Sequence, residues 1–110
     1  MTRPDEVRIA LVTAPTSVAH DLARALVQRR VAACVNVVPG VRSVYRWEGA
    51  VEEADEAILV VKVDAARASS LPERVAELHP YDVPEVLVLE VGEGLPAYLS
   101  WVIESTVGVS

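Results

Sequence analysis

Two β-strand patterns meet at a tight turn, and their pairing constrains the fold more than any other feature of the sequence. One pattern runs over residues 33–47 and the other over residues 51–63, with Glu48 and Gly49 between them. Strand patterns that flank a short glycine-containing turn are typical of a β-hairpin. Both strands are long for a chain of 110 residues, so we expect the hairpin to extend beyond the rest of the domain.

The two predicted strands differ in their regularity. Pro39 and Gly40 interrupt the first strand, so we expect a bend or bulge there. Beyond this break, one face of the strand carries Val41, Ser43, Tyr45 and Trp47. The far end of the second strand, residues 58–61, is entirely apolar, which predicts a position in the centre of the sheet.

Strand and helix patterns also occupy the rest of the chain. Residues 7–13 are mostly apolar and β-branched, as in a strand. A break at residues 15–17 offers a helix N-cap, and apolar side chains then recur at helical spacing over residues 18–26. Residues 86–91 predict a fourth strand, and residues 95–102 predict a short C-terminal helix.

The second helix has two competing starts. Asp64 can cap a helix that begins directly after the hairpin, but Pro72 would then kink it. Ser70 and Glu73 also form a capping-box pattern that places Pro72 in the first turn, where proline is tolerated. In both cases His79 precedes a proline and ends the helix.

The order of the elements is β-α-β-β-α-β followed by a C-terminal helix. This order predicts an α+β, ferredoxin-like fold, with residues 1–110 as a single domain. Two helices cover one face of such a sheet. Many apolar residues remain on the other face, where nothing else in the subunit covers them, so we expect a homo-oligomer whose copy number composition does not give.

Charge and composition exclude several classes of protein. The formal net charge is −6 and the isoelectric point is about 4.8, which argues against nucleic acid and anionic membranes as partners but is compatible with metal ions. No apolar run approaches the roughly 20 residues of a membrane-spanning helix, and the N-terminus lacks the apolar region of a signal peptide. The single cysteine, Cys34, fits a reducing compartment. We therefore expect a cytoplasmic protein.

Residues 79–85 combine a stiff backbone with chemically active side chains. Pro80 and Pro84 restrict this segment. An imidazole, a phenol and two carboxylates stand beside them, on His79, Tyr81, Asp82 and Glu85. An ordinary turn needs none of these groups, so the segment is either a ligand site or a joint between subunits.

Each candidate metal ligand also has a structural interpretation. Cys34 lies within a strand, where a cysteine is commonly a small buried hydrophobe, but its thiolate would suit copper(I) or zinc. A complete site would need His79, a carboxylate or cysteines of neighbouring subunits. His79 can instead cap the preceding helix, and Asp82 and Glu85 can serve as turn acceptors or salt-bridge partners.

Two charged residues and the aromatic residues are candidates for a cleft or an interface. Glu56 begins an apolar strand, and a buried carboxylate there needs a partner. Lys62 lies on the same strand and the same face. Packing or an interface is the expected role of the aromatic residues, which are Tyr45, Trp47, Tyr81, Tyr98 and Trp101.

Catalytic motifs do not occur in the sequence. We find no glycine-rich phosphate loop, no paired-cysteine motif and no motif of zinc proteases or serine hydrolases. A nucleophilic pair of Cys34 and His79 would require a mid-strand thiol to be exposed and activated. We therefore do not expect an enzyme.

Several motifs in order resemble the CutA-type divalent-cation tolerance protein family, from about Leu11 to Trp101. These motifs are residues 32–36, residues 39–47, Glu56, Lys62, residues 79–85 and residues 98–101. The resemblance implies a ferredoxin-like subunit in a tight homotrimer, with hairpin strands that extend across subunits. It also implies a role in tolerance of copper and other divalent cations, without a metal requirement for folding.

The resemblance also assigns roles to individual residues. It implies that Cys34 and His79 are the metal ligands, with Asp82 and Glu85 as acidic groups nearby. It implies structural or cleft-lining positions for Tyr81, Trp47, Tyr98 and Trp101. Because such trimers are similar in shape to PII-type signalling proteins, a second hypothesis is a regulatory or scaffold trimer that binds a small ligand or a partner in clefts between subunits.

Overall fold

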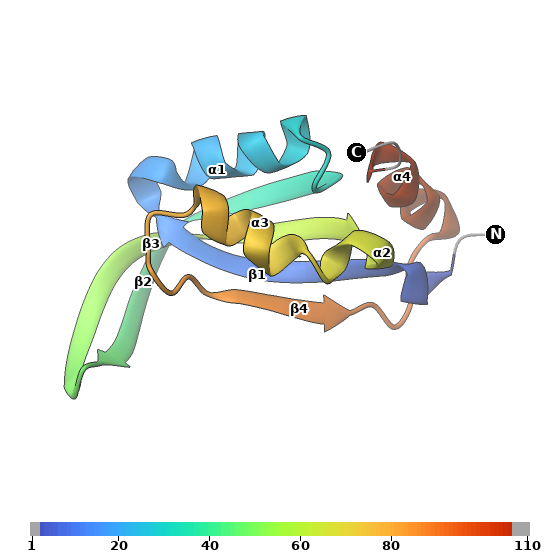
Figure 1. Ribbon diagram of the computed structural model, residues 1–110. Helices are drawn as coiled ribbons and strands as arrows, with labels where there is room; N and C mark the ends of the chain where they lie inside the picture. Colours follow the sequence, from blue (N-terminus) through green and yellow to red (C-terminus); the bar gives the residue numbers. More distant parts are fainter. Residues whose placement is uncertain (1–2, 107–110) are drawn as a thin grey trace.

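The computed structural model describes residues 3–106 as a four-stranded antiparallel sheet with helices along one face and a C-terminal helix at one end (Figure 1). The strands lie in the order β2-β3-β1-β4. Their bounds are Val7–Pro15 for β1, Cys34–Trp47 for β2, Ala50–Asp64 for β3 and Val86–Glu90 for β4. Since β1 and β3 are central and pair with each other, the predicted ferredoxin-like topology is confirmed.

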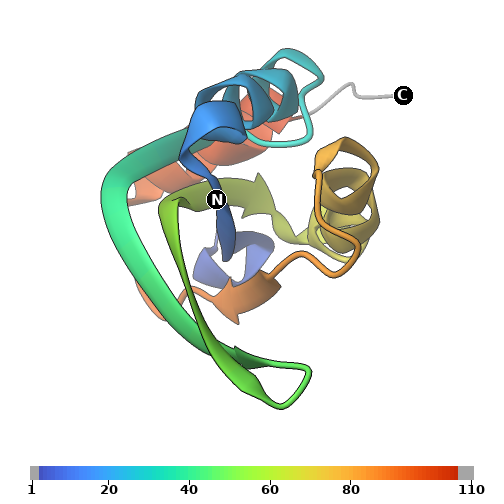
Figure 2. The same cartoon turned by 90° about the vertical axis from the view of Figure 1, so that its left-hand side faces the viewer.

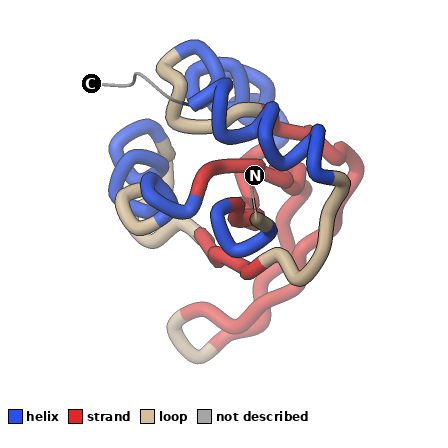
Figure 3. Tube along the Cα trace, turned by 90° about the vertical axis from the view of Figure 1, so that its right-hand side faces the viewer, coloured by secondary structure: helices blue, strands red, loops and turns tan. Residues whose placement is uncertain are grey.

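Within residues 3–106, five helical segments complete the fold. They are the 3-10 turn η1 (Pro4–Glu6), α1 (Thr16–Gln28), α2 (Ala65–Ala68), α3 (Leu71–Leu78) and α4 (Pro96–Thr106). Figure 3 shows the longer helices at the top and the left of the view, with the hairpin turn projecting at the bottom. Within residues 3–106, no helix has the length and hydropathy needed to cross a membrane.

Alternating side chains of the central strands form the main core. Ala10, Val12 and Ala14 of β1 are fully buried under the helices, as are Leu59 and Val61 of β3. From the helix layer, this core receives Leu22, Leu26, Leu71 and Val75. A smaller cluster joins α4 to the end of the sheet and contains Val7, Ala33, Leu99 and Val102.

The second helix is divided, which resolves its two predicted starts. α2 ends at Ala68, and α3 begins at Leu71 with Pro72 in its first turn, so proline removes no helical hydrogen bond. The predicted side-chain caps are wrong. The Ser70 hydroxyl donates to the Arg67 carbonyl, and Asp64 forms an ion pair with Arg67 of 2.7 Å. Neither side chain caps a backbone N–H of the helix that follows.

The face of the sheet opposite α1 and α3 is apolar, and α4 covers it only at one end, where Val7 is buried. Its strand positions alternate with the buried ones, and we call it the open face. It carries Ile9, Leu11, Val60, Leu87 and Leu89. Leu87 is 55 % exposed and Leu89 is 46 % exposed. An exposed apolar surface of this kind is typical of an interface.

The β2–β3 hairpin extends from the sheet as a curved arm (Figures 1 and 2). The predicted irregularity is confirmed as a register shift between Val38 and Val41, where Gly40 has a φ of 75°. At the tip, Glu48 has a φ of 48° and Gly49 a φ of 81°, as a tight hairpin turn requires. Near the arm's base, Arg42 forms exposed ion pairs with Glu53 and Asp55, which contribute little to stability.

Candidate ligand pocket and metal-ligand residues

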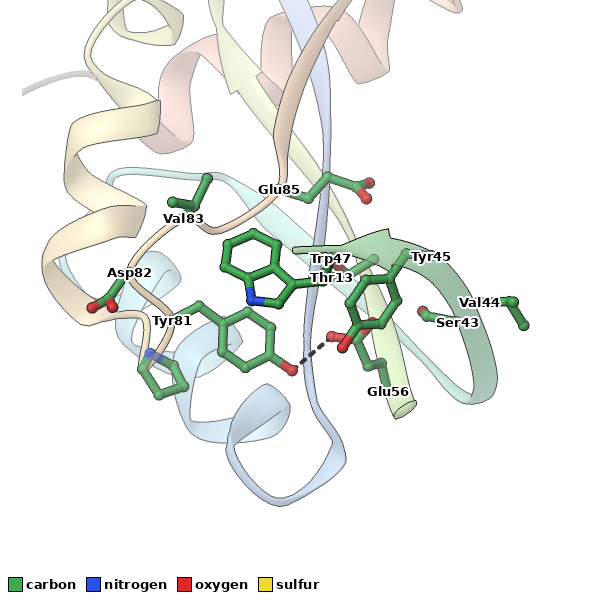
Figure 4. A pocket seen from close by; sticks show the side chains of 11 residues that line it. Thr13, Ser43, Val44, Tyr45, Trp47, Glu56, Tyr81, Asp82, Val83 and Glu85 are labelled. Carbon is green, nitrogen blue, oxygen red and sulfur yellow. Dashed lines mark hydrogen bonds between the residues drawn. The ribbon is translucent and has the colours of Figure 1, made fainter. Parts of the chain in front are cut away.

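A pocket of about 690 Å³ lies between the hairpin arm, from Glu56 at its base to Trp47 beside its turn, and the segment that joins α3 to β4. We call it the hairpin-base pocket. Its lining comprises Thr13, Ser43, Val44, Tyr45, Trp47, Glu56, Pro80, Tyr81, Asp82, Val83 and Glu85 (Figure 4). Elements distant in the sequence therefore meet here, and the volume is typical of small-molecule sites.

A hydrogen bond from Tyr81 to Glu56 ties the two sides of this pocket together. The Tyr81 hydroxyl donates to Glu56 Oε2 over 2.9 Å (Figure 4). Glu56 is only 5 % exposed, so the prediction of a buried carboxylate that needs a partner is confirmed. Burial, followed by the bond to Glu56, raises the pKa of Tyr81 to about 12, and the phenol therefore stays protonated as a donor at neutral pH.

His79 holds this segment against β1. The Tyr81 backbone N–H donates to His79 Nδ1 over 3.1 Å, so Nδ1 is the acceptor and Nε2 carries the proton. Nε2 lies 2.7 Å from the Thr13 carbonyl oxygen and donates to it. The imidazole thus fixes the loop rather than capping α3, and neither ring nitrogen is left free for a metal ion.

Asp82 and Glu85 stand at the rim of the pocket (Figure 4). Both are exposed. Among residues 3–106, neither carboxylate has a hydrogen-bond or ion-pair partner, so the expected turn or salt-bridge role is not formed within the described part of the subunit. Both remain available to a ligand.

Cys34 lies on the open face and does not line the hairpin-base pocket. Lys62 Nζ donates to Cys34 Sγ over 3.8 Å. The Tyr98 phenol lies beside the Cys34 thiol, and its pKa is raised first by burial and then by Cys34. The ring of Tyr98 is 5.6 Å from that of Trp101. The aromatic residues therefore form two groups, one at the pocket and one on α4.

The structure does not bring Cys34 and His79 together in one subunit. Cys34 pairs with Lys62 of β3, whereas His79 bonds to Thr13, which pairs with Ile58. These two points of β3 are about 13 Å apart at 3.3 Å per residue. In the part of the chain that the structure describes, no group of three or more His, Cys, Asp and Glu side chains could hold a metal ion.

Sequence reasoning missed part of the pocket. Ser43 shares the predicted strand face of Tyr45 and Trp47, and this alternation could have identified it. Thr13 also lines the pocket, and no pattern in the sequence singled it out.

The fold and these sites define a class of protein: a small ferredoxin-like subunit with one uncovered sheet face and a pocket at the base of a long hairpin. A family model described as CutA1 divalent ion tolerance protein matches residues 8–105. The divalent-cation tolerance protein CutA of Thermus thermophilus is 48 % identical over 99 residues, which cover 89 % of this chain and 96 % of that protein. The chain belongs to the CutA1 divalent ion tolerance family, which confirms the resemblance.

Solved structures agree in fold. A PII-like protein CutA from Nostoc sp. PCC 7120 matches with a TM-score of 0.86 and 39 % identity over 90 % of this chain and 96 % of that one. A CutA from Archaeoglobus fulgidus, described as periplasmic, matches with a TM-score of 0.85 and 30 % identity over 91 % of this chain and 98 % of that one. Several vertebrate relatives are longer, and the chain spans 60 to 62 % of their length.

Proposed function

We propose that this protein is a cytoplasmic homotrimer that binds divalent cations, copper among them, and acts by binding rather than by catalysis. Family membership supports the link to divalent cations. The trimer is supported by the open face, since Leu87 and Leu89 leave apolar surface that a second and a third copy would cover. The curved arm offers further surface for contact with a neighbour.

The position of Cys34 carries the metal-binding part of the proposal. The thiol is half-buried on the open face, so a trimer that closes this face would also place a thiol at its interface. Soft thiolate ligands favour copper(I) and zinc. Asp82 and Glu85 offer oxygen ligands at the pocket rim, whereas His79 would first have to give up one of its two hydrogen bonds.

An anaerobic copper(I) titration against a chelating competitor tests this proposal. We expect stoichiometric binding by the wild type and more than about tenfold weaker binding by Cys34→Ser. Because the imidazole of His79 is already engaged, His79→Ala should change copper affinity far less.

His20→Ala is the matched control, because His20 is exposed on α1 and lies outside both candidate sites. The particle mass of each variant is measured alongside, so that loss of binding is separated from loss of assembly. Copper affinity that is the same in wild type and Cys34→Ser would contradict the ligand assignment.

A second candidate function is a PII-like trimer that binds a small ligand. The hairpin-base pocket favours it, since the pocket has the volume of a small-molecule site and unpaired acidic groups at its rim. On this candidate, Tyr81→Ala would remove ligand binding and leave copper affinity unchanged.

A further inference from the structure

Three aromatic rings surround the hairpin-base pocket. Tyr45 and Trp47 come from the arm, and Tyr81 comes from the segment before β4 (Figure 4). Each ring is partly exposed, at 44 % for Tyr45, 50 % for Trp47 and 39 % for Tyr81. The π-faces of such rings attract a cation that lies within about 6 Å of their centres.

The charges of the pocket have one sign. Glu56, Asp82 and Glu85 contribute carboxylates, and none of the lining residues within residues 3–106 is Lys, Arg or His. A cation that enters therefore meets attraction from every charged group of the lining. The rings and the carboxylates favour the same kind of ligand, although they act through different interactions.

Glu56 gives a second and independent indication that the pocket binds a cation. It is 5 % exposed, and within residues 3–106 the only hydrogen-bond partner of its carboxylate is the uncharged Tyr81 phenol, with no cation within ion-pair distance. A buried carboxylate normally has a cationic partner. A positively charged ligand in the hairpin-base pocket would supply it.

We propose that the hairpin-base pocket binds a small organic cation, an ammonium or guanidinium ion with apolar substituents. The rings would contact the substituents and the charge, and Glu56 would form the ion pair. A bare metal ion fits these walls less well, because it needs several oxygen ligands at 2.0–2.6 Å, and no such group occurs in the described part of the chain. The inference deepens the small-ligand candidate and does not depend on metal binding.

The test is an NMR titration of the assembled protein with a chelator present throughout. Two cations, choline and butylammonium, are compared with their uncharged analogues 3,3-dimethylbutan-1-ol and 1-butanol. We expect the Trp47 indole N–H and the Tyr81 amide signals to shift in a saturable way. At least one cation should bind about tenfold or more tightly than its uncharged analogue.

Two variants with the same charge change locate the site. Glu56→Gln keeps the size of the side chain and removes the buried charge, so cation binding should fall about tenfold or more. Glu73→Gln removes an exposed carboxylate on α3 outside the pocket and should leave binding unchanged. The particle mass and amide spectrum of each variant check that the fold persists.

Three results would overturn the proposal. The first is the absence of saturable shifts with both cations, as expected if a neighbouring copy fills the pocket. The second is equal binding of cations and uncharged analogues, which would leave a pocket for small ligands without selectivity for charge. The third is an equal effect of Glu56→Gln and Glu73→Gln. Since the chelator removes metal ions, none of these results bears on copper binding.

Discussion

At the scale of single residues, the contacts of Tyr81 connect three parts of the chain. Its hydroxyl donates to Glu56 of β3, its backbone N–H donates to His79, and its ring lies 4.8 Å from the imidazole. His79 in turn bonds to Thr13 of β1. This chain of contacts positions the segment before β4 against the central strands and shapes one wall of the pocket.

Tyr81 gives the first prediction, which concerns alkaline pH. Its pKa is raised from 10.0 to about 12, so its contribution to folding is complete below about pH 10 and is lost as the pH rises through about 12. The shift of the pKa sets an upper limit of about 2.7 kcal/mol on the contribution of Tyr81 to the free energy of unfolding. Because Tyr81 is 39 % exposed, screening reduces the expected contribution to about 1 kcal/mol.

The measurement compares urea unfolding of wild type and Tyr81→Phe at several pH values and one protein concentration. The difference in free energy of unfolding should be largest below about pH 10 and should shrink toward pH 12. A difference that stays constant across this range would contradict the assigned role of the phenol.

His79 gives the second prediction. His79→Ala removes two hydrogen bonds and leaves the Thr13 carbonyl without its donor, so the free energy of unfolding should fall by about 1–3 kcal/mol. His20→Ala, on the exposed side of α1, should change it by less than about 0.5 kcal/mol. Equal effects of the two substitutions in denaturant unfolding would show that His79 does not hold the loop.

Residue-level features were predictable only where the cause is local. The need of Glu56 for a partner followed from a carboxylate in an apolar strand. The partner itself, Tyr81, lies 25 residues away, and only the tertiary arrangement brings it close. The same reason explains why the sequence did not predict the bond of His79 to Thr13, which spans 66 residues.

Among the elements, the hairpin was the most predictable and the helix starts were the least. Strand alternation and turn residues act over a few positions, so the turn at Gly49 and the bulge at Gly40 could be predicted. Capping is less predictable, because a short polar side chain can bond either to the first N–H groups of the helix or to another neighbouring group. Asp64 and Ser70 both engage Arg67 instead of the helix N-termini.

The bulge gives the third prediction. Gly40 has a φ of 75° with open space where a Cβ would lie, so Gly40→Ala should cost only the backbone strain, about 1 kcal/mol. Gly92 has equally open space and no positive φ, so Gly92→Ala should be neutral within about 0.5 kcal/mol. Denaturant unfolding of both variants measures the difference, and a neutral Gly40→Ala would contradict the strained bulge.

At the scale of the whole molecule, the open face gives the fourth prediction. Leu89→Asp places a charge on this face and should lower the particle mass in light scattering, because a buried unpaired charge destabilises an interface. Val27→Asp, at a 40 % exposed position on α1, should leave the mass unchanged. A full-size particle with Leu89→Asp would contradict an interface at the open face.

The uncovered apolar face was foreseeable because two helices can cover only one side of a four-stranded sheet. The separation of Cys34 from His79 was not predictable from the sequence, because it depends on which ends of β2 and α3 lie near each other. A metal site that uses Cys34 therefore depends on assembly, and assembly and metal binding should be measured together.

Native mass spectrometry of the protein after anaerobic addition of copper(I) makes this measurement directly. We expect a particle of three 11.9 kDa chains that carries copper, and a Cys34→Ser particle of the same chain number without copper. A wild-type monomer, or a trimer that carries equal copper with and without the Cys34 thiol, would contradict this expectation.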